Sequence, residues 1–292
     1  MAAFFGMPGN EDLADALAAQ TGSEAGAVEI RRFPDAESYV RILAAANEKA
    51  FLVCTLARPD EQFVPLVFAA RALRTSGAND VTLVAPYLAY LRQDRRFREG
   101  EAVTSRTFAE LVSLDFDALV TVDPHLHRYA SLDEIYTIPA IVVHSAPLVG
   151  GWVRDNVKAP LVLGPDEESA QWVEEVARQV GCPWAVFAKE RRGDRDVRLT
   201  APALGRYRER TPVLIDDIIS SGATMIEAAK LVRAAGMQPP HCIAVHGLFS
   251  TGTVERLGAV AKSLVTTDSI PNPRADLKLA PLIAQQLPTG FA

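Results

Sequence analysis

The chain has 292 residues, of which 49% are hydrophobic and 23% are charged, a balance typical of a folded globular protein and not of a disordered one. Its 30 Lys and Arg against 36 Asp and Glu give a net charge of −6, which argues against duplex nucleic acid as the main partner because phosphate neutralisation needs a basic surface. The three cysteines, Cys54, Cys182 and Cys242, are far apart and have no CxxC spacing, so we expect neither a disulfide framework nor a structural zinc site.

The longest charge-free run, residues 135–153, is long enough to span a bilayer, but it contains two prolines and the pair Gly150-Gly151. We therefore expect a strand, a turn and the start of a helix there. The N-terminus lacks the basic stretch of a signal peptide and turns acidic at Glu11 and Asp12. These features favour a cytoplasmic protein without a membrane partner.

Apolar runs alternate with amphipathic stretches along the chain. We expect strands at 50–57, 80–85, 118–123, 161–163, 184–188, 213–217 and 242–245, and helices near 61–75, 105–114, 170–180 and 223–235. This alternation implies βαβ units with parallel sheets and helices on both faces. A boundary near 145–155 would give two α/β domains, 1–146 and 147–292. Ligands of open α/β sheets bind beyond the carboxyl ends of strands, so polar residues that follow strands are the candidate site residues.

The strongest candidate site follows the strand expected at 213–217. Two adjacent carboxylates, Asp216 and Asp217, lead into a turn of small residues, Ser220–Thr224, and then into a helix. Backbone N–H groups at a helix N-terminus favour a phosphate monoester, and the aspartates could hold sugar hydroxyls or a hydrated magnesium ion. The simpler alternative is that a serine of the turn only caps the helix and that the aspartates form a solvated strand end.

A cluster of arginines follows the strand expected at 80–85. Arg92, Arg95, Arg96 and Arg98 lie within seven residues. Guanidinium groups concentrated in this way on an acidic protein attract a polyphosphate, whose oxygens match the guanidinium fork. Charge alone favours the simpler interpretation of a solvated loop, so the arginines gain weight only from the sequence around them.

Residues 212–224 resemble the phosphoribosyl-pyrophosphate loop that phosphoribosyltransferases share with ribose-phosphate pyrophosphokinases, the enzymes that make phosphoribosyl pyrophosphate from ATP and ribose 5-phosphate. Residues 86–94 look like the Pro-Tyr…Arg-Gln-Asp stretch of the pyrophosphokinases, which decides between the two families. Further segments resemble the same family at Phe33-Pro-Asp-Ala-Glu37, Asp123-Pro-His125, Pro165-Asp166 and Lys189-Glu190-Arg191. The chain is identified as a member of this family, closer to its archaeal-type branch.

The resemblance implies two phosphoribosyltransferase-like domains, each a mainly parallel sheet flanked by helices, with ATP on the side of 1–146 and ribose 5-phosphate on the side of 147–292. It implies ATP contacts at Arg92, Gln93, Asp94 and His125, and at Phe33, Asp35 and Glu37 for the site of a neighbouring copy. It implies ribose 5-phosphate contacts at Asp166, Asp216, Asp217, Ser220, Ser221, Gly222, Ala223 and Thr224. It assigns catalysis to Lys189, Arg191 and His125, and the metal, Mg²⁺, to His125 and Asp166.

The reaction that the resemblance implies is a direct displacement. The anomeric hydroxyl of ribose 5-phosphate attacks the β-phosphorus of MgATP, AMP departs, and a diphosphoryl group is transferred in one step. Lys189, Arg191 and magnesium would stabilise the charge on the transferring group. We also expect a homo-oligomer built from dimers.

The chain departs from the family's pattern at two points. Glu167 and Glu168 stand where most members have small or glycine residues, and the added carboxylates could alter metal occupancy. Ala223 replaces a glycine of the common loop and would be strained by about 1 kcal/mol if its position required positive φ. Two other functions therefore stay open, a non-catalytic regulatory homologue and a phosphoribosyltransferase.

Overall fold

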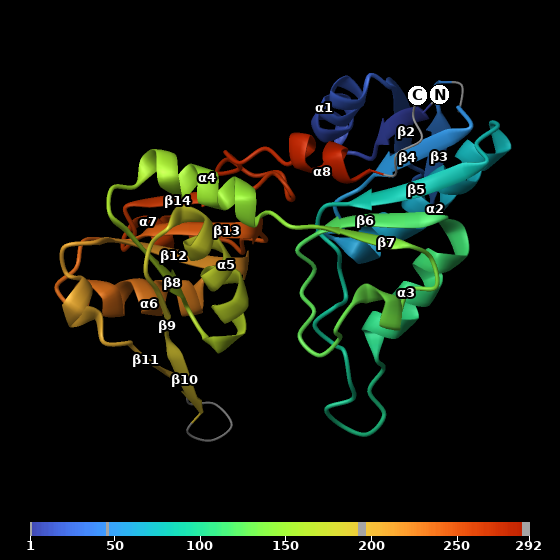
Figure 1. The fold of residues 1–292 in the computed structure, drawn as a ribbon. Coiled ribbons are helices and arrows are strands. Elements are labelled where there is room, and N and C mark those ends of the chain that lie inside the picture. Colours follow the sequence, from blue (N-terminus) through green and yellow to red (C-terminus); the bar gives the residue numbers. More distant parts are fainter. Residues whose placement is uncertain (1, 45–46, 192–196, 288–292) are drawn as a thin grey trace. The chain divides into compact units, whose positions relative to one another are not determined.

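The computed structural model of the chain describes residues 2–44, 47–191 and 197–287, and the chain divides into two compact units (Figure 1). The first unit runs to Val143 and takes in the C-terminal helix, and the second runs from His144 to Leu279. This division differs from the expected split into 1–146 and 147–292 chiefly at the C-terminus. The last helix joins the first unit because it packs against the first helix of the chain, and its Ile283 is fully buried.

The first unit is a mainly parallel sheet with helices. Its elements are β1 (Ala2–Gly6), α1 (Glu11–Thr21), β2 (Glu24–Arg32), β3 (Ser38–Ile42), β4 (Lys49–Val53), α2 (Pro59–Thr75), β5 (Asp80–Ala85), α3 (Thr104–Asp115), β6 (Ala118–Val122), the short 3-10 turn η1 (Leu132–Glu134), β7 (Ala140–Val143) and α8 (Ala280–Gln286). Seven strands pair in the order β3-β2-β1-β4-β5-β6-β7, and only β2 and β3 run antiparallel.

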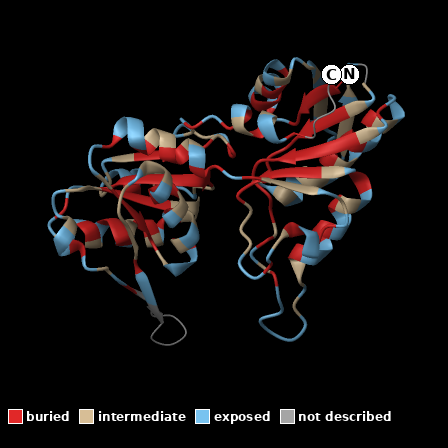
Figure 2. Cartoon of the chain, viewed as in Figure 1, coloured by how far each residue is buried: buried red, intermediate tan, exposed pale blue. Residues whose placement is uncertain are grey.

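The strands at the centre of the first sheet are more buried than the strands at its β2–β3 edge. The central strands β1, β4 and β5 are almost wholly buried, which their continuous apolar runs allow (Figure 2). Phe4 of β1 stacks on Phe51 of β4 with ring centroids 4.6 Å apart. The edge hairpin of β2 and β3 is mostly exposed or half-buried and carries charged residues.

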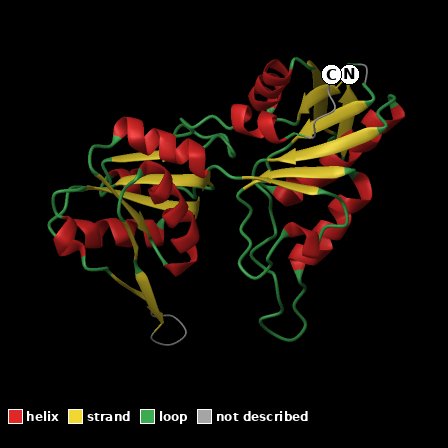
Figure 3. Ribbon diagram, viewed as in Figure 1, coloured by secondary structure: helices red, strands yellow, loops and turns green. Residues whose placement is uncertain are grey.

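The second unit contains a separate parallel sheet. Its elements are α4 (Ala146–Asn156), β8 (Pro160–Gly164), η2 (Glu167–Ser169), α5 (Ala170–Val180), β9 (Trp184–Val186), β10 (Ala188–Arg191), β11 (Val197–Thr200), η3 (Leu204–Tyr207), β12 (Thr211–Ile219), α6 (Ala223–Ala234), β13 (His241–Gly247), α7 (Thr253–Gly258) and β14 (Ser263–Thr266). Five parallel strands pair in the order β14-β13-β12-β8-β9, and β10 pairs with β11 as an antiparallel hairpin (Figure 3).

Side chains of the second sheet alternate between two apolar clusters. Leu161 and Leu214 pack with α6 and α7 on one face. Val162 and Val213 pack with α4 and α5 on the other. This alternation follows from the two-residue period of a strand, and it covers both faces of the sheet with helices.

The expected fold class is confirmed, and several element boundaries are corrected. The helix expected at 170–180 and the strand expected at 80–85 are found with those bounds. The single strand expected at 184–188 is two, because the chain leaves the sheet at the fully buried Phe187. No helix of the described residues has the length and apolar character needed to cross a membrane.

Candidate active site

The turn after β12 forms the amino end of α6, as the sequence predicted. The strand continues to Ile219, so Asp216 and Asp217 lie within its carboxyl end and not after it. Gly222 has a φ of 72° and immediately precedes the helix, whereas Ala223 is already its first residue. The strain considered for Ala223 therefore does not arise, because glycine occupies the left-handed position.

The turn is held from the side of α7. Thr253 Oγ1 donates hydrogen bonds to the carbonyl oxygens of Ser220 and Ser221, at 3.1 and 3.3 Å, and Arg256 donates to the carbonyl of Ser221 at 3.1 Å. Since the first N–H groups of an α-helix have no acceptor within the helix, a turn fixed in this way presents donors to an anion. Thr253 and Arg256 lie more than thirty residues after the serines that they contact, and no local pattern in the sequence indicated them.

Three carboxylates and one ammonium group gather at the carboxyl ends of β8 and β12. Burial, and then the charges of Asp217 and Asp166, raise the pKa of Asp216 well above its usual range. Lys189 Nζ lies 3.7 Å from Asp166 Oδ2. A cluster of partly buried negative charge is stabilised by a cation or by hydroxyl donors, so this arrangement suits a magnesium ion or a sugar.

Asp166 is fixed by its own turn. Its Oδ1 accepts from the backbone N–H of Glu168 at 3.2 Å, and Ser169 Oγ donates to its carbonyl at 2.6 Å. A Cβ at Gly164 would lie 2.2 Å from Ser169 Oγ, so the strand must end in glycine for this turn to close. Glu167 and Glu168, the two residues that depart from the family pattern, are exposed.

Among the described residues, no group of three or more His, Cys, Asp or Glu is arranged as a ready-made metal site. Magnesium usually takes one or two protein carboxylates and completes its shell with water and substrate phosphates. The acidic cluster of Asp166, Asp216 and Asp217 fits that donor set. His125, the other expected ligand, belongs to the first unit, whereas Asp166 belongs to the second.

In the first unit, the loops after β5 and β6 begin side by side, because these strands are neighbours in the sheet. Arg92 and Gln93 lie in the first loop and His125 in the second; Arg92 is exposed and the other two are half-buried. Each loop contains a non-glycine residue at positive φ, Tyr90 at 61° and Asp123 at 34°. Backbone strain of this kind is found preferentially at functional sites.

Asp94 points into the protein. Its side chain is only 1% exposed, and its carboxylate accepts hydrogen bonds from Arg128 Nη1 at 2.7 and 2.8 Å. Burial alone would raise the pKa of Asp94, but the Arg128 guanidinium lowers it below its ordinary value. The sequence analysis missed Arg128, and its place three residues after His125 was the only hint.

Phe33, Asp35 and Glu37 lie in the turn between β2 and β3 and are exposed. The turn is closed by the Phe33 N–H, which donates to the Glu37 carbonyl at 2.8 Å. Strands β1 and β4 lie between β2 and β5, so β2 and β5 themselves are about 14 Å apart at the usual strand spacing.

Lys189 and Arg191 lie in β10, which with β11 forms the charged hairpin that the sequence allowed. The side chain of Arg191 and residues 192–196 lie outside the described part of the chain. Of the Lys-Glu-Arg segment, the structure therefore describes only the side chain of Lys189.

Two mainly parallel α/β units, one with a small-residue turn at the amino end of a helix beside a carboxylate cluster, define an enzyme of the phosphoribosyltransferase-like class. The sequence pattern of the "N-terminal domain of ribose phosphate pyrophosphokinase" matches residues 2–114, and that of the "phosphoribosyl transferase domain" matches residues 131–270. The chain is 34% identical to the ribose-phosphate pyrophosphokinase of Methanopyrus kandleri over 92% of each chain. It belongs to the ribose-phosphate pyrophosphokinase family.

Other relatives agree with this assignment. The ribose-phosphate pyrophosphokinase of Thermococcus kodakarensis is 32% identical over 87% of this chain and 89% of its own. The crystal structure of phosphoribosylpyrophosphate synthetase from Mycobacterium smegmatis superposes with a TM-score of 0.83 at 25% identity, covering 97% of this chain and 96% of that one. The similarity to archaeal enzymes confirms the expected branch, and the protein is a transferase of diphosphate groups.

Proposed function

We propose that this enzyme transfers the β,γ-diphosphoryl group of MgATP to the anomeric hydroxyl of ribose 5-phosphate, giving phosphoribosyl pyrophosphate and AMP. One observation carries the proposal: the turn Ser220–Thr224, at the amino end of α6, follows a strand end at which Asp216 lies close to Asp217 and to Asp166, and Asp166 lies close to Lys189. A sugar phosphate and a transferring polyphosphate need these kinds of group, donors for phosphate, oxygens for hydroxyls and metal, and a cation for the reacting phosphates.

Ribose 5-phosphate is assigned to the second unit. Its phosphate binds the backbone N–H groups and hydroxyls of Ser220, Ser221, Gly222, Ala223 and Thr224. Asp216 and Asp217 accept hydrogen bonds from the ribose hydroxyls, because a buried carboxylate is stabilised by donors. Thr253 and Arg256 hold the turn in the conformation that binds the phosphate.

ATP is assigned to the first unit, where Arg92, Gln93 and His125 follow adjacent strands. Magnesium would supply electrostatic stabilisation of the phosphate oxygens, with His125 as its expected ligand in this unit and Asp166 as its expected ligand in the second. The adenine of each ATP is contacted by the hairpin residues Phe33, Asp35 and Glu37 of a neighbouring copy. The exposure of that turn, and the two strands that lie between β2 and β5 in the sheet, support a shared site.

The chemistry is a single displacement at phosphorus. The anomeric oxygen bonds to the β-phosphorus. At the same time the bond breaks between the β-phosphorus and the oxygen that bridges it to the α-phosphorus. AMP leaves with the electron pair of the broken bond, and the hydroxyl proton is released. Lys189 and Arg191 stabilise the negative charge on the transferring group, and positioning supplies the rest of the rate enhancement.

The test is to incubate the protein with MgATP, with and without ribose 5-phosphate, and to separate the nucleotides by anion-exchange chromatography. AMP that forms only when the sugar phosphate is present supports the proposal. ADP would mean ordinary γ-phosphoryl transfer and would contradict it. No turnover by folded protein that binds ATP would also contradict it and would favour a regulatory homologue.

A further inference from the structure

Arg128 joins the two loops to which the nucleotide is assigned. It follows His125 by three residues in the loop after β6, and its guanidinium binds both oxygens of Asp94 in the loop after β5. The Asp94 side chain is 1% exposed, whereas Arg92, two residues earlier, is exposed. Asp94 therefore has its carboxylate occupied inside the protein while its neighbours face outward.

The backbone around Asp94 is fixed by the same elements. The Tyr129 hydroxyl donates to the Asp94 carbonyl at 3.2 Å and lies 2.9 Å from Ser105 Oγ at the start of α3. The backbone N–H of Ser105 donates to the carbonyl of Gln93 at 3.3 Å. Tyr129 and Ser105 are both buried, so residues 93 and 94 are attached to α3 and to the loop after β6.

We propose that Arg128 is a positioning residue for the nucleotide, and that Asp94 acts by binding Arg128 and not by touching ATP. The ion pair fixes the position of Arg92 and Gln93, in the loop after β5, relative to His125, in the loop after β6. This inference rests on the assignment of ATP to the first unit and adds to it a residue that no sequence motif indicated. An arginine is suited to the task because it stays charged, and one nitrogen of its guanidinium, Nη1, lies 2.7 and 2.8 Å from the two Asp94 oxygens.

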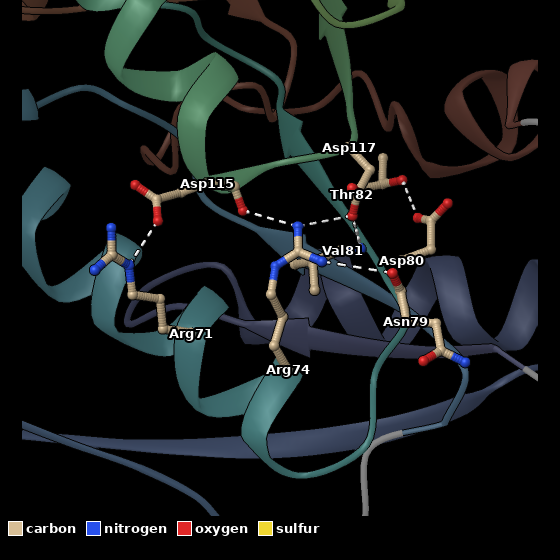
Figure 4. Close-up of polar contacts among 8 residues, drawn as sticks. All are labelled: Arg71, Arg74, Asn79, Asp80, Val81, Thr82, Asp115 and Asp117. Atoms are coloured by element: carbon tan, nitrogen blue, oxygen red, sulfur yellow. Dashed lines mark hydrogen bonds and ion pairs between the residues drawn. The ribbon is translucent and has the colours of Figure 1, made fainter.

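The same unit contains a matched ion pair for comparison. Arg71 Nε binds Asp115 Oδ1 at 2.7 Å, the length of the bond from Arg128 to Asp94, but this pair lies at the amino ends of the strands (Figure 4). Removing Arg71 deletes an arginine–aspartate pair without touching the loops after β5 and β6. Arg71→Ala is therefore the control for a merely structural effect.

The experiment measures MgATP binding by calorimetry, and the KM values for ATP and ribose 5-phosphate, in wild-type protein and in Arg128→Ala, Arg128→Lys and Arg71→Ala. We expect Arg128→Ala to weaken ATP binding and raise the KM for ATP by about 10- to 100-fold, because small misplacements of binding groups have effects of that size. The KM for ribose 5-phosphate should stay within about twofold of wild type, and Arg71→Ala should change neither value. Arg128→Lys should restore binding in part.

Unchanged ATP binding in folded Arg128→Ala, beside a wild-type protein that binds MgATP, would overturn the inference and leave the proposed function standing. An equal loss in Arg71→Ala would also overturn it, since the effect would then be one of general stability. Wild-type protein that fails to bind MgATP would overturn both. If Arg128→Ala does not fold, Arg128→Lys and Asp94→Asn carry the test, and wild-type ATP binding in both would contradict the inference.

Discussion

Lys189 places a cation beside Asp166 at the carboxyl end of β8. We expect Lys189→Ala to lower kcat by about 100- to 1,000-fold, because a group that stabilises charge in the transition state has effects of this size. Binding of MgATP should stay within about twofold of wild type, since we assign the nucleotide to the first unit. Rapid-quench kinetics and calorimetry measure the two effects separately.

Lys230 provides the control for that substitution. It forms an exposed pair with Glu227 on α6, with Nζ and Oε2 3.9 Å apart. Lys230→Ala removes the same charge from the same unit and should leave kcat unchanged. Normal turnover by Lys189→Ala would remove this lysine from the mechanism.

Gly222 is the position in the turn Ser220–Thr224 that only glycine suits. Its φ is 72°, and a Cβ there would lie 2.9 Å from Thr253 Cγ2. We expect Gly222→Ala to lower the free energy of unfolding by about 1–2 kcal/mol, the cost of a left-handed alanine. It should also raise the KM for ribose 5-phosphate, because Thr253 holds the turn. Urea denaturation and steady-state kinetics test the two effects.

Gly151→Ala is the matched substitution in the same unit. Gly151 lies inside α4, has no positive φ, and has nothing within 4 Å of the position of a Cβ. Alanine is favoured over glycine inside a helix by about 1 kcal/mol, so this variant should be at least as stable as wild type with an unchanged KM. A Gly222→Ala protein that behaves like Gly151→Ala would contradict the assigned role of the turn.

At the scale of elements, a cluster of hydrogen bonds joins α2 to the start of β5 and β6 (Figure 4). We call it the polar clamp, and it consists of Arg74, Val81, Asp115 and Asp117. Asp117 Oδ2 accepts from the backbone N–H of Val81 at 2.7 Å and from Arg74 at 2.8 Å. Arg74 also donates to the carbonyl of Asp115 at 3.2 Å. The clamp lies at the amino ends of the strands, away from the loops of the site, so its role is in stability.

Asp117→Ala tests the clamp. Val81 is fully buried, and its N–H would lose this side-chain acceptor, which costs about 1–3 kcal/mol of unfolding free energy. Asp117→Asn keeps an oxygen acceptor and should lose less. Both variants should keep wild-type KM values. An Asp117→Ala protein of wild-type stability would show that the hydrogen bond contributes nothing.

Elements with strong local signals could be predicted from the sequence. The helix Ala170–Val180 has an apolar stripe and ends at Gly181, whose φ is 73°. The hairpin of β2 and β3 was not predicted as strands, because an exposed edge carries charges in the way a loop does. Residues 280–286 could not be assigned to the first unit, because packing against α1 and β7, which are distant in the sequence, places them there.

The same distinction applies to the site. Asp166, Lys189, Asp216 and the turn after β12 were found because each lies at or after the carboxyl end of a strand expected from the sequence. Arg128, Thr253 and Arg256 act on residues more than thirty positions away, and no short motif reports such contacts. Only the structure therefore reveals the residues that hold the candidate site residues in place.

At the scale of the whole molecule, the proposed shared ATP site requires more than one copy of the chain. If Phe33 completes the site of a neighbouring copy, then Phe33→Ala and Lys189→Ala damage a site from different chains. An equal mixture that exchanges subunits should recover about one quarter of wild-type activity, because half of the dimers then contain one intact site. Steady-state assays of the mixture, with light scattering to follow the assembly, measure this.

The control mixture combines Lys189→Ala with Gly222→Ala. Both residues lie in the second unit, so no pairing of these chains restores an intact site. The activity of this mixture should not exceed the sum of the activities that Lys189→Ala and Gly222→Ala show separately. No recovery in the first mixture, or full activity from a monomer, would contradict the shared site.

The central claim is that a diphosphoryl group passes from ATP to ribose 5-phosphate in one step. Phosphorus NMR of the purified protein with magnesium, ATP and ribose 5-phosphate tests it most directly, with the sugar phosphate omitted as the control. The account predicts sugar-dependent growth of the AMP signal, matched by the coupled pair of signals of a new sugar diphosphate. Signals of ADP, or of AMP and free pyrophosphate without the sugar diphosphate, would contradict it.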